Sequence, residues 1–342
     1  MPDIQRLDLH DEGQLAAFDR VYLDASREGR PYATPWPLPE RRAAWLMPST
    51  TQHYEGWLYV TGDEVQGVAE IELPLLDNTH VADVSIYVPA RFGRRGVGTA
   101  LAEHIAHRLR AEGRRVVQAF ISGAQIIEGG VEATSRSPGE AFATRLGLTN
   151  RLVNIHRVLA LPLSDQRLRQ LAEQAAVASA GYRLVSWVDS CPAEHVDAYC
   201  LLKAALLEQV PMGDLEFETE VWGEARLRER EAELVAMGRT MYVQVAVAPD
   251  GDMVGHTEIV VPRHDPERVF QWDTLVLPEH RGHRLGITLK VTNHVLVQYD
   301  HPDRQEAHTW NAEDNPAMGT VNDALGYRSV ELMGEWQGPV PA

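Results

Sequence analysis

The sequence predicts an α/β protein, more closely α+β, that contains two diverged copies of one domain. The first observation is an alternating strand over 84–88 that leads through a loop rich in glycine and arginine into an amphipathic helix. The same order recurs later in the chain, with Gly98 and Gly286 of the two loops 188 positions apart. Upstream, the segments 67–74 and 255–262 match at Gly, Glu, Ile and Pro with the same spacing. Two motifs that share one spacing indicate an internal repeat.

The loop that recurs has a composition that suits phosphate. Glycines let backbone N–H groups approach an anion, arginines supply positive charge, and the N-terminus of the following helix adds a partial positive charge. We therefore expect a phosphorylated ligand at this loop. A dinucleotide-binding fold is a weaker interpretation, because Gly93, Gly96 and Gly98 invert the spacing of its glycine motif.

The first copy shows strand and helix patterns in a regular order. Alternating apolar residues predict strands over 4–9, 54–61, 64–73, 81–88 and 115–121. Helical spacing predicts helices over 13–23, 99–113 and 137–146. The segment 27–40 is rich in Pro, Gly and aromatic residues, which predicts an irregular connection that either helps to form a substrate pocket or simply packs.

The second copy repeats most of this order. Its predicted strands lie over 183–187, 241–248, 253–261 and 270–277, and its predicted helices over 193–210 and 287–299. Alternating acids and arginines over 216–237 predict a solvated helical insertion. The predicted domains are therefore 1–162 and 181–342, joined by a linker helix over 163–180.

Composition excludes several classes of function. The formal net charge of −17 argues against a nucleic-acid partner and suits a cationic amine as well as an ordinary solvated surface. The cysteines, Cys191 and Cys200, form no disulfide or metal pattern, and the histidines show no HExxH spacing, so we expect no metal. The absence of a signal or membrane-spanning pattern predicts a cytoplasmic protein that does not bind membranes.

Each copy resembles the GNAT superfamily of acyl-CoA-dependent N-acyltransferases. The resemblance is carried by the loop around Gly96 and Gly98, its repeat around Gly286, and the segments 310–318 and 321–327. It implies two tandem GNAT folds, each a mixed, mostly antiparallel twisted sheet flanked by helices. It also implies that acetyl-CoA is the donor and that a small-molecule amine attacks the thioester directly.

The resemblance also implies which residues contact acetyl-CoA, namely the end of one strand and the following loop in each copy, with two asparagines of the second copy. In the first copy these residues are Ile86, Tyr87, Val88, Gly93, Arg94, Arg95, Gly96, Val97, Gly98 and Thr99. In the second copy they are Leu275, Val276, Leu277, Arg281, Gly282, His283, Arg284, Leu285, Gly286, Asn311 and Asn315.

The two loops depart from the family pattern differently. The first keeps Gly96 and Gly98, whereas the second has Arg284 where the first of these glycines is expected. Because a missing Cβ lets the backbone approach pyrophosphate, we favour the first loop as the better acetyl-CoA site.

The candidate catalytic residues are four carboxylates, of which Glu70 and Glu258 occupy equivalent positions of the two copies. Glu70 and Glu258 lie on the strand before the loop strand and are the first candidates for the proton acceptor, with Asp83 and Asp273 next. The family commonly has a tyrosine as general acid at the position of Asn322, and an amide cannot replace it as a proton donor. Another tyrosine or water would then protonate the leaving thiolate.

The sequence therefore predicts a cytoplasmic, monomeric or homodimeric tandem GNAT N-acetyltransferase that acts on a small amine. The resemblance extends to tandem GNAT proteins of actinobacterial antibiotic and clavulanic acid pathways. Two alternatives stay open: an acyl-CoA-binding or scaffolding protein in which one or both copies are inactive, and an acetyltransferase of the aminoglycoside-resistance type.

Overall fold

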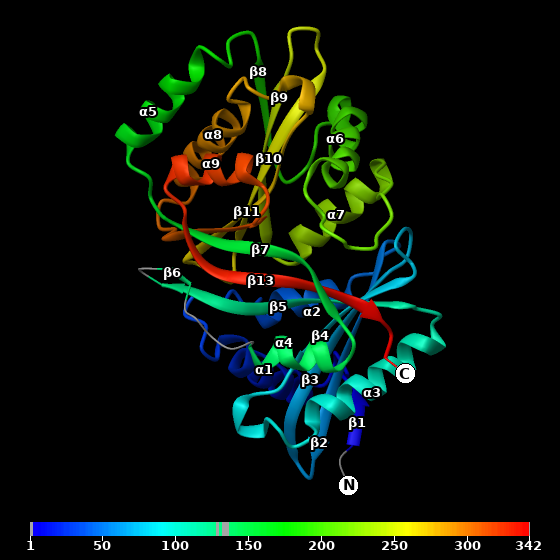
Figure 1. Ribbon diagram of the computed structural model, residues 1–342. Helices are drawn as coiled ribbons and strands as arrows, with labels where there is room; N and C mark the ends of the chain where they lie inside the picture. The colour runs from blue at the N-terminus through cyan, green and yellow to red at the C-terminus, as the bar shows by residue number, and fades with distance from the viewer. Residues whose placement is uncertain (1–2, 128–129, 132–136, 342) are drawn as a thin grey trace. The chain divides into compact units, whose positions relative to one another are not determined.

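The computed structural model describes residues 3–127, 130–131 and 137–341 (Figure 1). The chain forms two compact units. The first comprises Met1–Val153, Gly213–Glu218 and Glu331–Ala342, and the second comprises Asn154–Met212 and Thr219–Val330.

The first unit is built on a mixed, mostly antiparallel sheet. Its strands are, in spatial order, β1 (Asp3–Arg6), β2 (Gln52–Thr61), β3 (Glu64–Pro74), β4 (Val81–Tyr87), β5 (Val116–Ile127) and β13 (Arg328–Pro339), and β6 (Gly130–Val131) pairs with β5. Its helices are α1 (Glu12–Arg27), α2 (Leu38–Leu46), α3 (Val97–Ala111) and α4 (Pro138–Arg145). Alternate residues of β3 face opposite sides: Val68 packs with α1, while Ile71 packs with α3.

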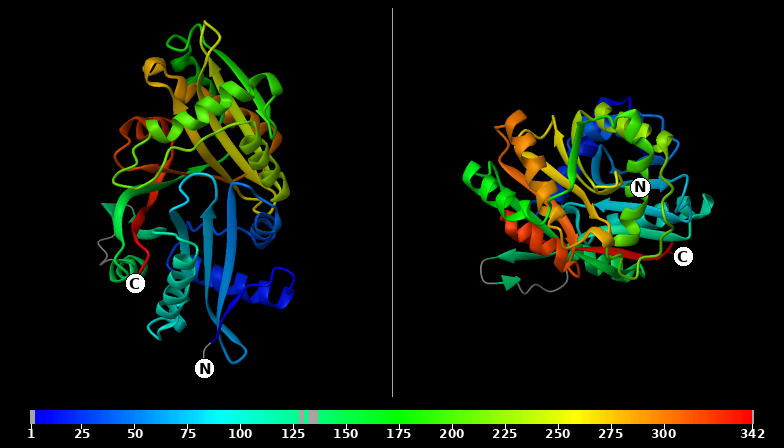
Figure 2. Two further views of the ribbon diagram at one scale, coloured as in Figure 1. Left: turned by 90° about the vertical axis from the view of Figure 1, so that its right-hand side faces the viewer. Right: turned by 90° about the horizontal axis from the view of Figure 1, so that it is seen from above.

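The second unit repeats this plan. The spatial order of its strands is β7 (Thr149–Ala160), β12 (Glu306–Ala312), β11 (Arg268–Val276), β10 (Met253–Pro262), β9 (Arg239–Val247) and β8 (Arg183–Val188). Its helices are α5 (Asp165–Ala176), α6 (Val196–Gln209), α7 (Glu224–Ala236), α8 (Leu285–Asp300) and α9 (Pro316–Leu325). Helices α6 and α7 cover one face of the sheet, and α5, α8 and α9 cover the other (Figures 1 and 2).

The repeat predicted from the sequence is present in the structure. Helix α3 begins at Val97 and α8 begins at Leu285, again 188 positions apart, and each follows a short 3-10 turn that begins at Ala90 or Pro278. The prediction of two α/β copies is therefore confirmed. The solvated insertion predicted over 216–237 is wrong in part, because α7 buries Leu227 and Leu234 in the core beneath α6.

Each unit takes its last strand from the other half of the sequence. In the first unit β13 pairs antiparallel with β5, with Trp336 opposite Ala119. In the second unit β7 pairs antiparallel with β12, with Leu159 opposite Ala307. The domains predicted from the sequence, 1–162 and 181–342, place β7 in the first copy and β13 in the second. A strand pattern does not identify the partner strand, so the exchange was not predicted. Helix α5, expected as a linker, packs in the core of the second unit.

In both units one pair of parallel strands separates after a few residues. Strand β4 pairs with β5 only from Val81 to Asp83, and β11 pairs with β12 only from Arg268 to Phe270. Beyond these points the strands leave backbone N–H and C=O groups without a ladder partner on the neighbouring strand, which favours a bound ligand between them. The loop that follows each separated strand leads directly into α3 or α8.

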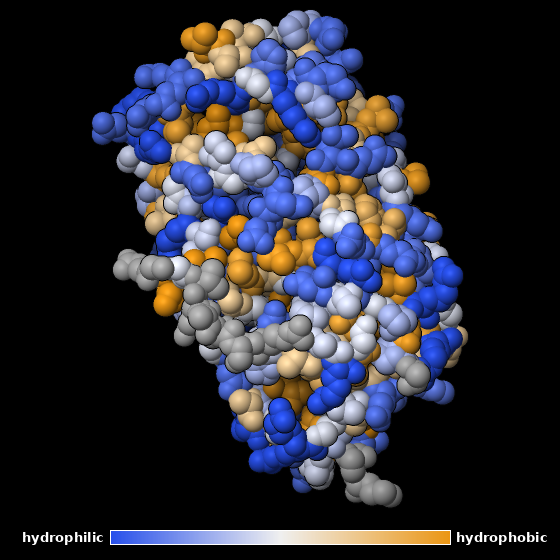
Figure 3. Space-filling model, viewed as in Figure 1, coloured by the Kyte–Doolittle hydropathy of each residue, from blue (hydrophilic) through white to orange (hydrophobic). Residues whose placement is uncertain are grey.

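Hydrophilic side chains cover much of the face shown in Figure 3, and hydrophobic side chains occur among them in smaller groups. No helix in the described residues has the length and apolar composition needed to span a membrane.

A buried ion pair fixes the exchanged strand β13 in the first unit, and we expect its loss to destabilise that unit. The Arg30 guanidinium donates to both carboxylate oxygens of Glu331 at 2.7 and 2.8 Å, and the Glu331 side chain is 1% exposed. Ser122 and Gln125 of β5 donate to the same carboxylate. Arg30→Met removes the guanidinium that donates twice to this buried carboxylate, so it should lower the free energy of unfolding by about 3 kcal/mol. Urea unfolding measures this change, and Arg30→Met with Glu331→Gln should recover part of the loss; equal stability of Arg30→Met and the native protein would contradict the prediction.

Candidate active site

The second unit contains a cavity of about 580 Å³ at the loop that leads into α8. One side is formed by Thr274, Leu275 and Val276 of β11, beyond the point where this strand leaves β12. The start of α9, from Asn315 to Met318, forms another side, and the loop from Arg281 to Gly286 closes one end. The cavity therefore joins a basic loop to a wall of mainly apolar residues, which suits a long ligand with a phosphorylated end.

The loops of the two units have the same unusual backbone conformation. Arg94 and Gly96 in the first loop have φ values of 60° and 87°, and Gly282 and Arg284, each 188 positions later, have 85° and 53°. Each loop thus has a glycine at one left-handed position and an arginine at the other. The sequence analysis expected the second loop to bind less well because it has Arg284 in place of a glycine. In the structure, Arg284 adopts the left-handed backbone conformation that Gly96 adopts at the same place in the first loop. A left-handed arginine is costly, and such strain concentrates at functional sites.

The helices that follow these loops begin without a side-chain cap. Gly96 precedes α3 and Arg284 precedes α8, and neither helix start receives a hydrogen bond from a capping side chain. The first N–H groups of each helix therefore stay open to an anion, whose charge the helix dipole also stabilises. This arrangement fits the phosphate site that the sequence predicts.

Most of the predicted acetyl-CoA contacts of the second copy line the cavity, namely Leu275, Val276, Arg281, Gly282, Arg284, Leu285, Gly286 and Asn315. Leu277, His283 and Asn311 are not among its lining residues; His283 contacts the Tyr182 ring and Asn311 donates to the Ala312 carbonyl. In the first copy, Ile86 and Val88 pack on the α3 side of the sheet, whereas the Tyr87 ring meets Tyr22 of α1. These contacts with acetyl-CoA stay predictions.

Glu70, the first candidate base of the first copy, is held in an ion pair. The Arg41 guanidinium donates to its carboxylate and also lies 3.4 Å from Asp19 and 3.8 Å from the Tyr22 ring centroid. Arg41 is carried by α2, which begins at Leu38, inside the segment 27–40 that the sequence predicted as irregular, and continues beyond it. The Glu70 carboxylate is therefore already engaged by a guanidinium of its own unit.

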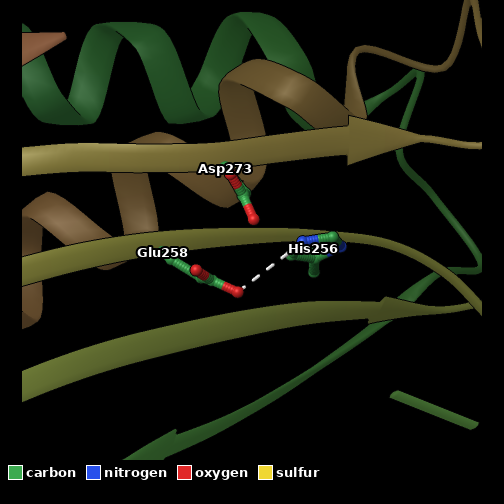
Figure 4. Close-up of side chains that lie close together, drawn as sticks. All are labelled: His256, Glu258 and Asp273. Atoms are coloured by element: carbon green, nitrogen blue, oxygen red, sulfur yellow. Dashed lines mark ion pairs between the residues drawn. The ribbon is translucent and has the colours of Figure 1, made fainter. Parts of the chain in front are cut away.

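Glu258, its equivalent in the second copy, is also held, but by a lysine. Tyr199 Oη donates to Glu258 at 2.5 Å and Lys203 Nζ donates to the same oxygen at 2.8 Å. Lys203 also donates to Asp273 at 2.5 Å. Figure 4 shows Asp273 pointing from β11 toward Glu258 and His256 of β10. Burial lowers the pKa of the His256 imidazole to about 4, so this ring is neutral at pH 7.

Asp83 differs from the other candidate carboxylates. It lies on β4 opposite Gln118, at the last paired position before β4 and β5 separate. Burial, with a further effect of the Glu335 charge on β13, raises the pKa of Asp83 to about 7. The residue 188 positions later is Gln271, which is buried and donates through its amide to Thr257 and to the Glu258 carbonyl. Only the first copy therefore has a carboxyl group with a pKa near neutrality at this position.

Asn322 lies in a buried hydrogen-bond chain. Its amide nitrogen donates to Asn311 at 3.0 Å, and its oxygen accepts a hydrogen bond from Lys290 Nζ at 2.7 Å. Asn322 is 0% exposed, so the structure gives it partners within the protein. Its catalytic role stays a prediction.

Lys290 is expected to cost stability at neutral pH. Burial, together with the Arg157 charge, lowers its pKa from 10.5 to about 7, so the unfolded chain binds a proton that the folded chain releases. Stability therefore rises with pH between about 7 and 10.5. Lys290→Met should stabilise the protein by about 4 kcal/mol at pH 7, less the lost bond to Asn322, and by progressively less as the pH rises. Thermal unfolding at several pH values measures this gain, and a gain that does not change with pH would contradict the assignment.

The two buried lysines at these sites were not predicted from the sequence. The signal was present, because Lys203 and Lys290 are the two lysines of the chain and all other basic residues are arginine or histidine. The Lys203 side chain is 11% exposed, and Lys290 as a whole residue is 1% exposed. Lysine is almost always exposed unless paired, so two lysines in apolar helical runs indicate buried sites.

Comparisons with known proteins agree with this architecture. Residues 18–124 match the model of the acetyltransferase (GNAT) family. A search of curated proteins finds no match. A solved tandem GNAT protein from the clavulanic acid biosynthesis pathway is 26% identical with a TM-score of 0.81, over 100% of this chain and 99% of that chain.

Two further solved structures show the same fold at lower identity. A GCN5-related N-acetyltransferase from Sphaerobacter thermophilus is 16% identical with a TM-score of 0.66, over 100% of this chain and 96% of that one. A GCN5-related glucosamine N-acetyltransferase region of a fungal multi-domain β-N-acetylglucosaminidase is 12% identical with a TM-score of 0.62, over 99% of this chain and 38% of that one. Residues 18–124 are therefore similar to the GNAT acetyltransferase family, and the whole chain, with its two repeated units, shares the fold of a tandem GNAT protein.

Proposed function

We propose that this protein is an acetyl-CoA-dependent N-acetyltransferase that modifies the amine of a small molecule. The observation that carries the proposal is the cavity of the second unit, where a basic loop and an uncapped helix start adjoin an exposed strand edge. Backbone N–H groups of the loop and of α8 would bind the pyrophosphate of acetyl-CoA. The unpaired backbone of β11 would hold the pantetheine arm by hydrogen bonds.

The first copy supplies the same elements for binding and, in addition, a candidate base. Its loop shares the backbone conformation of the second, and β4 separates from β5 directly after Asp83. With a pKa of about 7, Asp83 can accept a proton from an ammonium group at neutral pH and leave a neutral amine able to attack. We therefore assign acetyl transfer to the first copy, and acetyl-CoA supplies the activated acetyl group there.

The class of acceptor follows from charge and from the protein family. The net charge of −17 attracts cationic amines, and the first copy presents Asp83, with Glu335 acting on its ionisation, where the strands separate. The tandem GNAT protein of 26% identity comes from a pathway for a small molecule, which supports a small-molecule acceptor. We propose a small primary amine of this kind.

The proposal is tested by incubating the protein with acetyl-CoA and a panel of small primary amines that includes amino sugars and aminoglycosides. We expect release of free CoA thiol together with an N-acetylated product for at least one amine. Transfer confined to aminoglycosides would favour the resistance-type alternative. Acetyl-CoA binding without transfer to any amine would contradict the enzymatic proposal and favour an acyl-CoA-binding protein.

A further inference from the structure

We propose that the second unit contains a binding site for a primary alkylammonium group and that its own Lys203 occupies this site, so that this copy holds acetyl-CoA without transferring the acetyl group. This inference rests on the proposed function. It adds the chemical class of ligand that the second site accepts and the reason why the duplicated site does not react.

The contacts of Lys203 are those of a bound ammonium ligand. Its Nζ donates to Glu258 at 2.8 Å and to Asp273 at 2.5 Å, and it lies 5.1 Å from the centroid of the Trp222 ring. Two carboxylates and an aromatic face form a strong site for an ammonium group. The Lys203 side chain is 11% exposed and that of Glu258 is 2% exposed, so the site is largely removed from water.

A second observation shows that the site is shaped for a ligand rather than being a chance group of acids. His256 is 0% exposed, and neither of its ring nitrogens has a hydrogen-bond partner among the described residues. Its Nε2 lies 3.8 Å from the Glu258 oxygen that Lys203 contacts (Figure 4). An unpaired buried imidazole is costly, and its place beside the ammonium marks a polar site that the protein retains.

The site lies beside the proposed acetyl-CoA cavity. Asp273 directly precedes Thr274, the first cavity-lining residue of β11, and both follow Phe270, where β11 leaves β12. Helix α6 carries Lys203 and ends at Gln209, which also lines the cavity. The ammonium is therefore held on the α6 side of the sheet, at the strand segment where the sheet opens.

The two copies differ at the positions that matter for this inference. By the 188-residue spacing, Asp273 corresponds to Ser85, so at this position only the second copy has an acidic side chain. The Lys203 ammonium neutralises that charge. Helix α1, the counterpart of α6, contains no lysine. Burial alone would lower the pKa of Lys203, but the Asp273 and Glu258 charges outweigh it and raise that pKa, so the amine stays protonated and cannot attack a thioester.

Removal of the ammonium should open the site to an added amine. Lys203→Ala removes the three outer methylenes and the nitrogen, which together correspond to n-propylamine. The variant is made in a Gly96→Asp background, in which the first copy is disabled. We expect n-propylamine to raise its melting temperature in a saturable manner, and 1-propanol, which lacks the charge, to have no such effect.

The opened site should also transfer acetyl groups. Propylammonium first loses one proton to the solvent. The neutral nitrogen then forms a bond to the acetyl carbonyl carbon as the carbon–sulfur bond breaks, and a second proton passes from nitrogen to the thiolate, which gives N-propylacetamide and CoA thiol. Glu258 and Asp273 together would also keep a bound propylammonium protonated, so the transfer assay uses Asp273→Asn in addition. We expect Lys203→Ala, Asp273→Asn, Gly96→Asp to form this product at least about tenfold faster than Gly96→Asp alone. This combination keeps the net charge of the site, so it also replaces Lys203→Ala in the melting experiment if Lys203→Ala does not fold.

The results distinguish a failure of the proposed function from a failure of the inference about Lys203. If native protein does not bind acetyl-CoA in calorimetry, the proposed function fails. If acetyl-CoA binds but n-propylamine neither stabilises the variant nor accepts acetyl, the occupied-site inference alone is wrong. Binding of n-propylamine without transfer would also overturn it, because Lys203 would then be a structural cation away from the thioester.

Discussion

Asp83→Asn is expected to lower kcat/KM for acetyl transfer by about 10²–10⁴-fold, the usual effect of removing a general base. Glu70 and Glu258 are held by Arg41 and Lys203, so Asp83 is the candidate carboxyl group best placed to accept a proton. Asparagine keeps the shape of the side chain, so acetyl-CoA affinity should change little. Steady-state kinetics with an amine found in the panel measures the effect, and full activity of Asp83→Asn would refute the assignment.

The pH dependence gives an independent test of the same residue. Asp83 must be ionised to act, so kcat/KM should rise as the pH increases through about 7. Burial is the larger cause of the raised pKa and the Glu335 charge is the smaller one. Glu335→Gln should therefore move the rise to lower pH without abolishing activity. An unchanged pH profile in Glu335→Gln would show that another group, such as the amine substrate itself, controls the rise.

Gly96→Asp is expected to reduce turnover about 100-fold or more, and by far more than Gly286→Asp does. Both substitutions place a carboxylate at the start of a helix, where it repels the pyrophosphate of acetyl-CoA. A Cβ at Gly96 meets nothing within 4 Å, and one at Gly286 lies 3.5 Å from Val321 Cγ2, so neither change forces a clash. The difference in turnover follows because transfer is assigned to the first copy.

Asparagine at each position provides the matched control. Gly96→Asn and Gly286→Asn have nearly the same shape as the aspartate variants but no charge, and asparagine tolerates the left-handed conformation of Gly96. Each should retain most of the acetyl-CoA affinity that its aspartate counterpart loses. If Gly286→Asp reduced turnover as much as Gly96→Asp, transfer would not be confined to the first copy.

The sequence was sufficient to predict the features that repeat. The shared spacing of Gly98 and Gly286 identified two copies, and the glycines, arginines and helix start identified the loops. The cavity in the second unit lies at the predicted second loop, even though the sequence ranked the first loop higher. That ranking counted glycines, whereas Arg284 adopts the same left-handed backbone as Gly96, and this conformation is not readable from residue type.

The exchanged strands and the ionic state of the candidate bases could not be predicted. Strand β13 over Arg328–Pro339 was not predicted, and a strand pattern would in any case specify which face is buried but not that the partner strand is β5. Glu70 and Glu258 are equivalent in sequence, but Arg41 and Lys203 reach them from helices that the repeat does not align. Ionisation depends on such contacts across the fold, so the distinction between Asp83 and the other acids required the three-dimensional structure.

Both loops are expected to bind acetyl-CoA, and calorimetric titration of acetyl-CoA into the native protein tests this directly. We predict one molecule of acetyl-CoA per loop, with one binding event lost in Gly96→Asp and the other lost in Gly286→Asp. Absence of binding to the native protein would contradict the proposed function, and a single event that both variants abolish would contradict the division of roles between the two copies.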